Sequence, residues 1–118
     1  MQLILASQSP RRKELLGLLR LPFIIRAADI DETMDGRLSP YDEVARLAKL
    51  KALAVQRDFD DVVIAADTIV VCENEVLCKP KDEEDAFRML RLLSGRDHQV
   101  MTGLCVLRGD RIRVCTEV

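Results

Sequence analysis

The sequence predicts a mixed α/β fold, and three observations support this fold class. Short, β-branched apolar runs alternate with segments whose apolar residues recur at helical spacing. Two of these helical segments begin with Ser-Pro, at residues 9–10 and 39–40, a pair that suits the N-cap and the first helical position. Near the C-terminus, Gly109-Asp110 joins two strand-like runs as a hairpin turn. No internal repeat or linker interrupts this order, so the pattern predicts one mixed α/β unit.

The first half of the chain contains two expected strands and two expected helices. Residues 2–6 ("QLILA") read as a short buried strand, and a helix follows over residues 10 to about 20. Residues 23–30 ("FIIRAADI") are a second strand candidate. The second helix runs from its N-cap at residue 39 to about residue 56, with acidic residues in its first turn that suit the helix dipole.

The second half is expected to supply the central strand. Residues 62–71 ("VVIAADTIVV") are too short and too β-branched for a comfortable helix and predict that strand. A turn then leads into a short strand ending at Lys79-Pro80, and a third helix spans about 82–95. Two further strands, roughly 98–107 and 111–118, complete the order.

Composition restricts the class of protein. The chain has 118 residues, of which 48% are hydrophobic, so one domain can bury a real core. Its net charge is −2 and its aromatic content is 3%, which disfavours a nucleic-acid binder, because such proteins carry basic excess or stacking aromatics. No run has the length of a membrane span and no signal peptide is evident. We therefore expect a soluble cytoplasmic protein that binds neither nucleic acid nor membrane.

The cysteines do not form a recognisable metal motif. No Cys-x-x-Cys pair occurs, and the chain has a single histidine, so a zinc site has little support. All the cysteines lie in or beside apolar runs, where a free cysteine acts as a small buried hydrophobe. We expect reduced core residues at Cys72, Cys78, Cys105 and Cys115.

The stretch "LASQSPRRKELL", residues 5–16, places Arg11, Arg12 and Lys13 in the first turn of a helix. A helix N-terminus already carries positive partial charge and unpaired N–H groups, so three cations there are unfavourable by themselves. An anion with several negative charges would make the arrangement favourable. This stretch therefore indicates a polyphosphate site.

Two charged residues fall on surfaces that are otherwise apolar. Asp67 interrupts the central strand, where a carboxylate is costly unless it is paired or bound to metal, which favours a functional role; alternatively the strand ends there and Asp67 caps a turn. Lys51 shares a helix face with apolar residues; alternatively its stem packs there and its ammonium group remains in water. The apolar residues on that face are Val44, Leu47, Ala48 and Val55.

Lys79 and Glu32 are weaker candidates. Lys79 precedes Pro80, which favours an extended backbone, yet most lysines are plain surface charges. Glu32 lies in the acidic loop "DIDET", and such clusters are more often solvated than metal-binding. Together with the first-turn cations, these residues suit a polyphosphate held with a hard divalent cation, Mg²⁺ or Mn²⁺. The chain contains neither G-x-x-x-x-G-K-S/T nor G-x-G-x-x-G, which disfavours common kinase and dinucleotide-binding folds.

Several blocks closely resemble the Maf-like nucleotide pyrophosphatase family. They are "LILASQSPRRKELL", "DIDE", "LAKLKA", "AADTIVV" and "LCKPKDEEDAFRMLRLLSGRDHQVMTG", in the family's order, and the resemblance extends from Met1 to Val118. It implies an elongated mixed sheet flanked by helices, related to the inosine triphosphate pyrophosphatases, with a nucleotide cleft. It also implies hydrolysis of nucleoside triphosphates to the monophosphate and pyrophosphate with a divalent metal.

The resemblance assigns roles to individual residues. Asp67 corresponds to the catalytic base and metal ligand, with Glu32 beside it at the metal, and Thr102 and Gly103 approach the cleft. Arg11 and Thr68 match the family positions that distinguish dTTP and UTP pyrophosphatases from enzymes acting on 7-methyl-GTP; modified pyrimidine nucleotides are further candidate substrates. The expected substrate-binding residues are Ser7, Arg12, Lys13, Lys51 and Lys79.

The chain departs from the family pattern in its length. Family members continue with an Asp-Lys-Ala-Gly stretch and a Tyr-Gly-Ile-Gln-Gly stretch, whose Gln helps recognise the base, and neither occurs here. We therefore expect residues 1–118 to form a single Maf-like domain that is C-terminally incomplete. The alternative function is a non-catalytic nucleotide-binding or regulatory protein linked to cell division. The expected partner is the nucleoside triphosphate. A homodimer with a second copy of the chain is a further expectation, which the residues leave open.

Overall fold

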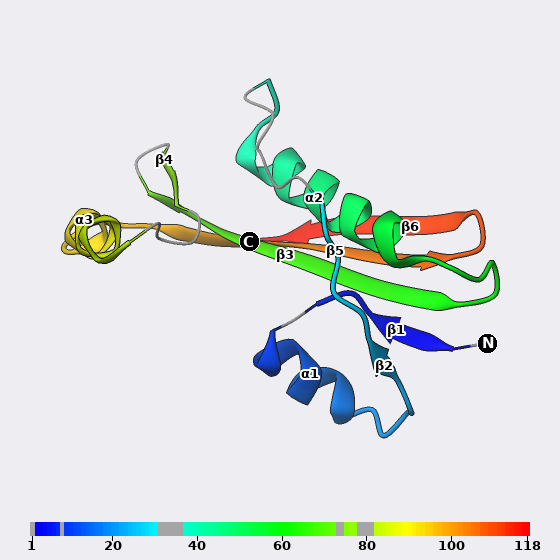
Figure 1. The fold of residues 1–118 in the computed structure, drawn as a ribbon. Coiled ribbons are helices and arrows are strands. Elements are labelled where there is room, and N and C mark those ends of the chain that lie inside the picture. The colour runs from blue at the N-terminus through cyan, green and yellow to red at the C-terminus, as the bar shows by residue number, and fades with distance from the viewer. Residues whose placement is uncertain (1, 8, 31–36, 73–74, 78–81) are drawn as a thin grey trace.

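The computed structural model describes residues 2–7, 9–30, 37–72, 75–77 and 82–118, and the expected mixed α/β fold is confirmed (Figure 1). The strands are β1 (Leu3–Leu5), β2 (Ile24–Ile25), β3 (Val62–Cys72), β4 (Glu75–Leu77), β5 (Gln99–Arg108) and β6 (Arg111–Glu117). The helices are α1 (Pro10–Gly17), α2 (Pro40–Val55) and α3 (Glu83–Leu93). The molecule is elongated, with principal extents of 47 × 30 × 23 Å.

One mixed sheet organises the chain. Its strands follow the order β2-β1-β3-β5-β6, and β4 pairs with β3 outside this path. The β1 strand is parallel to β2 and β3, whereas β4 and β5 are antiparallel to β3. The hairpin between β5 and β6 turns at Gly109, as expected. The longest strand, β3, therefore lies at the centre of the sheet and contacts three neighbours.

The main core lies between α2 and one face of the sheet (Figure 1). Ser39 caps α2 by accepting a hydrogen bond from the Asp42 N–H at 3.2 Å, as the sequence predicts. The C-terminal end of α2 is also tied down, because Arg26 donates to the Val55 carbonyl at 2.8 Å. Residues of β1, β3, β5 and α2, together with the residue after β1, form the buried cluster Ile4, Ala6, Ala48, Ala52, Val55, Val63, Ala65, Cys105 and Leu107.

The first helix and the second strand are clearly shorter than the sequence predicts. The first helix was expected to reach about Arg20, but α1 ends at Gly17. Turns closed by i→i+3 backbone hydrogen bonds follow as far as Arg20, which has a φ of 57°. This left-handed backbone ends the series of turns that follows α1. Of the strand candidate 23–30, only Ile24–Ile25 forms a strand, because its partner β1 has just three residues.

The expectation for the cysteines is confirmed at two positions and wrong at a third. Cys72 and Cys105 are free and buried, and burial raises the pKa of the Cys105 thiol, which therefore stays protonated at neutral pH. Cys115 is exposed, because it lies on the face of β6 away from α2. Cys78 lies outside the described residues.

No helix in the described ranges combines the length and apolar character needed to cross a bilayer.

Candidate functional site

The candidate site lies at a gap along one edge of β3. On this edge β1 pairs with residues 62–64 of β3, and β4 pairs with residues 70–72. Within the described part of the chain, residues 65–69 have no strand neighbour on that side, while β5 covers the other side throughout. The gap exposes backbone groups in the middle of the central strand, at the point where Asp67 and Thr68 are located.

Lys51 and Asp67 form an ion pair on the α2 side of this gap. The Lys51 Nζ lies 2.9 Å from the Asp67 Oδ1, and the two side chains are 14% and 17% exposed. The pair explains both sequence anomalies, because the opposite charges offset the cost of removing each group from water. Asp67 therefore does not end the strand, since β3 continues to Cys72, and the ammonium group of Lys51 is not simply solvated.

Arg12 approaches the same segment of β3 from α1. Its NH1 donates to the Ala66 carbonyl at 3.0 Å, and its NH2 donates to the Thr68 Oγ1 at 2.8 Å. The Ser9 Oγ accepts from the Arg12 backbone N–H at 3.4 Å, so the helix cap and the guanidinium belong to one turn. The open edge of β3 thus receives a cation in place of a neighbouring strand.

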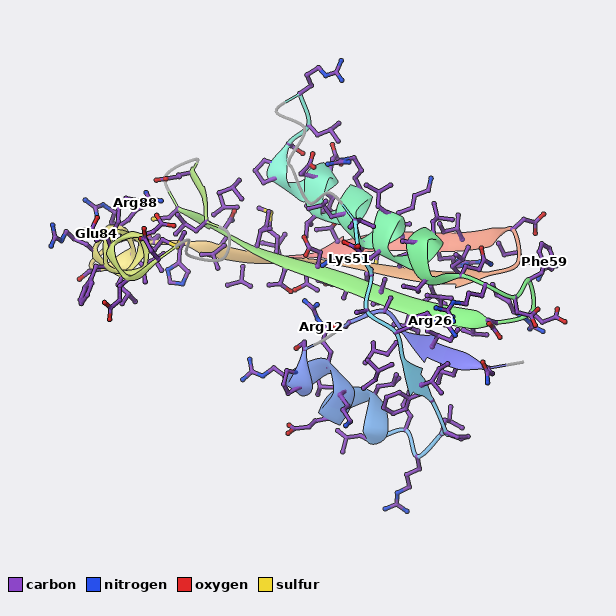
Figure 2. All side chains as sticks on the ribbon, viewed as in Figure 1. Arg12, Arg26, Lys51, Phe59, Glu84 and Arg88 are labelled. Carbon is purple, nitrogen blue, oxygen red and sulfur yellow. The ribbon has the colours of Figure 1, made fainter. Side chains whose placement is uncertain are left out.

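The two charged groups approach β3 from opposite sides, as Figure 2 shows for Arg12 and Lys51. Successive side chains of a strand point to opposite faces, so Asp67 faces α2 and Thr68 faces the α1 side. An anionic ligand lying along the open edge would meet the guanidinium on one side and the ammonium group on the other. Such an arrangement suits a phosphate chain with several charged oxygens.

The remaining predicted residues of the first turn lie close by in the chain. Ser7 is buried, and its Oγ accepts from the Ser9 backbone N–H at 3.1 Å, which shapes the turn between β1 and α1. Arg11 and Lys13 have exposed side chains on α1. The structure therefore brings Arg12, Lys51, Asp67 and Thr68 together and leaves Arg11 and Lys13 at the surface.

Glu32 and Lys79, the other predicted ligands, lie outside the described residues. Among the residues that are described, no group of three or more His, Cys, Asp or Glu side chains is arranged to hold a metal ion. Among the described residues, Asp67 is the one that brings a carboxylate to the gap.

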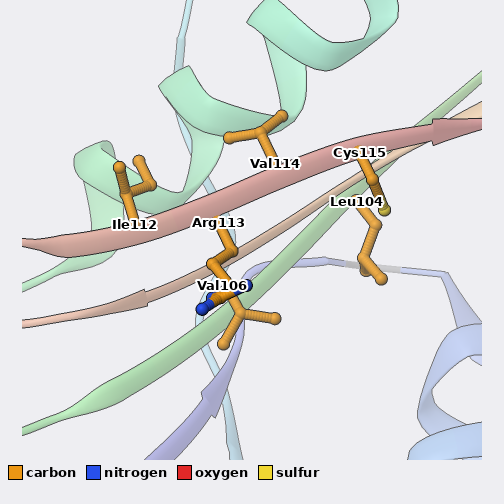
Figure 3. Close-up of a pocket in the computed structure, with 6 residues that line it drawn as sticks. All are labelled: Leu104, Val106, Ile112, Arg113, Val114 and Cys115. Atoms are coloured by element: carbon orange, nitrogen blue, oxygen red, sulfur yellow. The ribbon is translucent and has the colours of Figure 1, made fainter.

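A hollow lies on the β5–β6 hairpin, on the opposite side of β3 from the open edge (Figure 3). Its lining is mainly aliphatic, and Arg113 is the charged residue in it. Such a lining does not suit a polyphosphate, so the gap in β3 remains the candidate site. The lining residues are Leu104, Val106, Ile112, Arg113, Val114 and Cys115.

The register between β3 and β5 adds neighbours to the site. Asp67 pairs with Gly103, and Thr68 pairs with Thr102, whose Oγ1 atoms lie 3.0 Å apart. Sequence reasoning missed the Ala66 carbonyl as a partner of Arg12. No local signal could reveal it, because the open edge follows from where β1 and β4 end.

Solved structures identify the class of fold. The chain matches a nucleoside-triphosphatase / dITP/XTP pyrophosphatase from Mycobacterium abscessus with a TM-score of 0.55 and 12% identity, over 99% of this chain and 71% of the other. It matches the Ham1 protein of Staphylococcus aureus with a TM-score of 0.57 and 17% identity, over 98% of this chain and 68% of the other. The chain therefore has the mixed α/β fold of these proteins, as the sequence predicts.

The chain belongs to the Maf-like protein family, whose pattern it matches over residues 2–118. It is 56% identical over 107 residues to a dTTP/UTP pyrophosphatase of Anaeromyxobacter dehalogenans, covering 91% of this chain and 54% of the relative. It is 52% identical over 111 residues to a dTTP/UTP pyrophosphatase of Bacillus velezensis, covering 93% of this chain and 59% of the relative. The chain thus spans a little over half the length of these curated relatives.

Proposed function

We propose that this chain is a nucleoside triphosphate pyrophosphatase that hydrolyses dTTP and UTP to the monophosphate and pyrophosphate. The observation that carries the proposal is the convergence of Arg12 and the Lys51–Asp67 pair on one open segment of β3. The names of the relatives, at about half identity, support the choice of substrates.

The cations of the site bind the triphosphate in this proposal. Arg12 has more N–H donors than the two that it gives to β3, and its planar guanidinium suits phosphate oxygens. Lys51 adds a compact positive charge on the other side of the strand. Lys13 and Lys79 are proposed to contact the same phosphates, and Ser7 to hold the turn that presents them.

Asp67 is the proposed general base. It accepts a proton from a water molecule whose oxygen attacks the α-phosphorus; the bond from that phosphorus to the bridging oxygen breaks, and pyrophosphate leaves. Lys51 orients the Asp67 carboxylate through the bond at 2.9 Å. Arg12 and Lys51 stabilise the charge that develops on the phosphate oxygens.

A divalent cation, Mg²⁺ or Mn²⁺, fits the chemistry of this site. Mg²⁺ is commonly held by one or two carboxylates together with substrate phosphates, and Asp67 is a partly exposed carboxylate at the gap. Asp67 and Glu32 are the proposed ligands. When bound, the cation would neutralise phosphate charge and acidify water.

The choice of base is proposed to depend on Arg11 and Thr68. Thr68 lies directly at the gap and holds Arg12, whereas Arg11 is exposed on α1. The same two residues, Arg11 and Thr68, are the reason for proposing modified pyrimidine nucleotides as further substrates.

The decisive experiment measures pyrophosphate release from dTTP, UTP, CTP and 7-methyl-GTP, with Mg²⁺ or Mn²⁺. We expect metal-dependent release from dTTP and UTP, and a loss of at least about a hundredfold in Asp67→Asn. Asp60→Asn is the matched control, because Asp60 is exposed and lies before β3 begins, and it should retain full activity. Comparable turnover in Asp67→Asn would remove Asp67 from the role of base.

The competing function is nucleotide binding without catalysis. The observation in its favour is that Asp67 already pairs with Lys51 at 2.9 Å, an ion pair that can serve the fold and the binding site without catalysis. Calorimetric titration with dTTP separates the two functions. Binding without pyrophosphate release from the unmodified chain would favour the non-catalytic function.

A further inference from the structure

Thr102 belongs to a chain of hydrogen bonds that ends at Arg12. The Arg12 NH2 donates to the Thr68 Oγ1 at 2.8 Å, and the Thr68 and Thr102 Oγ1 atoms lie 3.0 Å apart. Thr68 and Thr102 are direct partners on neighbouring antiparallel strands, so their side chains share one face of the sheet. This series of hydrogen bonds thus runs from α1 across β3 to β5.

The chemistry of the groups fixes the direction of the hydrogen bond between Arg12 and Thr68. A guanidinium only donates, so the Thr68 hydroxyl must accept from Arg12. A hydroxyl has one proton and two lone pairs, so Thr68 can still bond to Thr102, either as donor or as acceptor. That bond selects the Thr68 rotamer in which Oγ1 faces Arg12, because a threonine side chain has few staggered alternatives.

We propose that Thr102 is a positioning residue for Arg12 and thereby controls how tightly the chain binds the triphosphate of a nucleotide. This inference rests on the proposed function for the role of Arg12 as a phosphate ligand. Thr102 acts through Thr68, and the carbonyl of Ala66 supplies the second fixed point of the guanidinium. A guanidinium held at two points is ready to bind phosphate without first losing conformational freedom.

The test compares Thr102→Val in two backgrounds. Valine keeps the shape of threonine and removes the hydroxyl, so dTTP affinity in the presence of Mg²⁺, measured by calorimetry, should fall about three- to tenfold. In an Arg12→Ala background the same substitution should change the affinity by less than about twofold, because Thr102 then has nothing to position. Equal losses in both backgrounds, or no loss in either, would overturn the proposal.

Two further variants separate positioning from a general effect on the fold. Thr102→Ser retains the hydroxyl and should restore wild-type affinity. Thr116→Val is the matched control, because the Thr116 Oγ1 bonds to the Tyr41 carbonyl and not to the Arg12 chain, so affinity should stay unchanged. A Thr102→Ser variant with reduced affinity for dTTP would contradict a specific role for Thr102. So would a Thr116→Val variant whose affinity falls as far as that of Thr102→Val.

A measurement without nucleotide distinguishes this inference from the proposed function. Arg12→Ala and Thr102→Val should have non-additive effects on the urea unfolding midpoint, because both break the same chain. If the unmodified chain binds no dTTP, the proposed function fails. The unfolding data then still test whether Thr102 holds Arg12 in place. Additive effects would show that Thr102 does not hold Arg12.

Discussion

Lys51 and Asp67 each occupy a position that would be unfavourable without the other. Asp67 lies in the central strand and Lys51 on the packed face of α2, and their side chains are only 17% and 14% exposed. A lone charge at either position would lose much of its hydration without compensation. Their separation of 16 residues in the chain hides the partnership from any local pattern.

A double-mutant cycle measures this partnership. We expect Lys51→Met and Asp67→Asn each to lower the free energy of unfolding, with a coupling of about 1–3 kcal/mol, between the values for exposed and fully buried pairs. Urea unfolding of both single variants and the double variant gives the coupling. A value within about 0.5 kcal/mol of zero would mean that the pair contributes little to the fold.

At the level of elements, α2 lies unusually close to β5. A Cβ atom at Gly103 would collide with the backbone carbonyl of Val44 in α2. Gly103 pairs directly with Asp67 in the sheet, so this close contact lies beside the candidate site. The absence of a side chain at Gly103 therefore lets α2 pack close enough to the sheet for Lys51 to reach Asp67.

Gly103→Ala should disturb both stability and binding. The backbone of α2 must move to accept the methyl group, so we expect a loss of about 1–3 kcal/mol in unfolding free energy and weaker dTTP binding. Gly17→Ala is the matched control, because a Cβ there meets nothing within 4 Å, and a gain of up to about 1 kcal/mol is expected from helix propensity. Thermal unfolding and calorimetry check both variants; a Gly103→Ala chain as stable as the wild type would contradict the close approach.

On the scale of the whole molecule, burial is uneven. The core joins α2 to one face of the sheet, whereas α1 buries only Leu16 and the described part of α3 buries no residue. Figure 1 shows α3 at the far end of the sheet, distant from α2. Large apolar side chains on these helices or at their ends remain exposed, including Leu15, Leu18, Phe87 and Leu90.

This distribution predicts local differences in hydrogen exchange. Amides of α1 and α3 should exchange at least about tenfold faster than those in the middle of α2, because little apolar burial opposes their opening. Exchange followed by mass spectrometry or NMR gives the protection of each helix. Protection of α1 equal to that of α2 would show that Arg12 and Leu16 anchor it more firmly than the burial suggests.

The local chemistry of the chain accounts for most of the elements. Ser39 and Pro40 set the start of α2, and the β-branched run at 62–71 forms β3 one residue longer than predicted. The predicted end of α1 is three residues too late, because the chain continues after Gly17 in i→i+3 turns and not in α-helical ones. Strand β2 is shorter than predicted because pairing depends on the length of β1, which lies elsewhere in the chain.

By itself, the sequence determined the mixed α/β class, the family and the unusual positions of Arg12, Lys51 and Asp67, since periodicity, caps and misplaced charges are properties of neighbouring residues. Only the tertiary structure decided that Lys51 pairs with Asp67 and that Arg12 docks on Ala66 and Thr68. These contacts depend on where β1 and β4 end along β3 and on the register between β3 and β5. Such distances arise from packing between segments far apart in the chain, which no local pattern specifies.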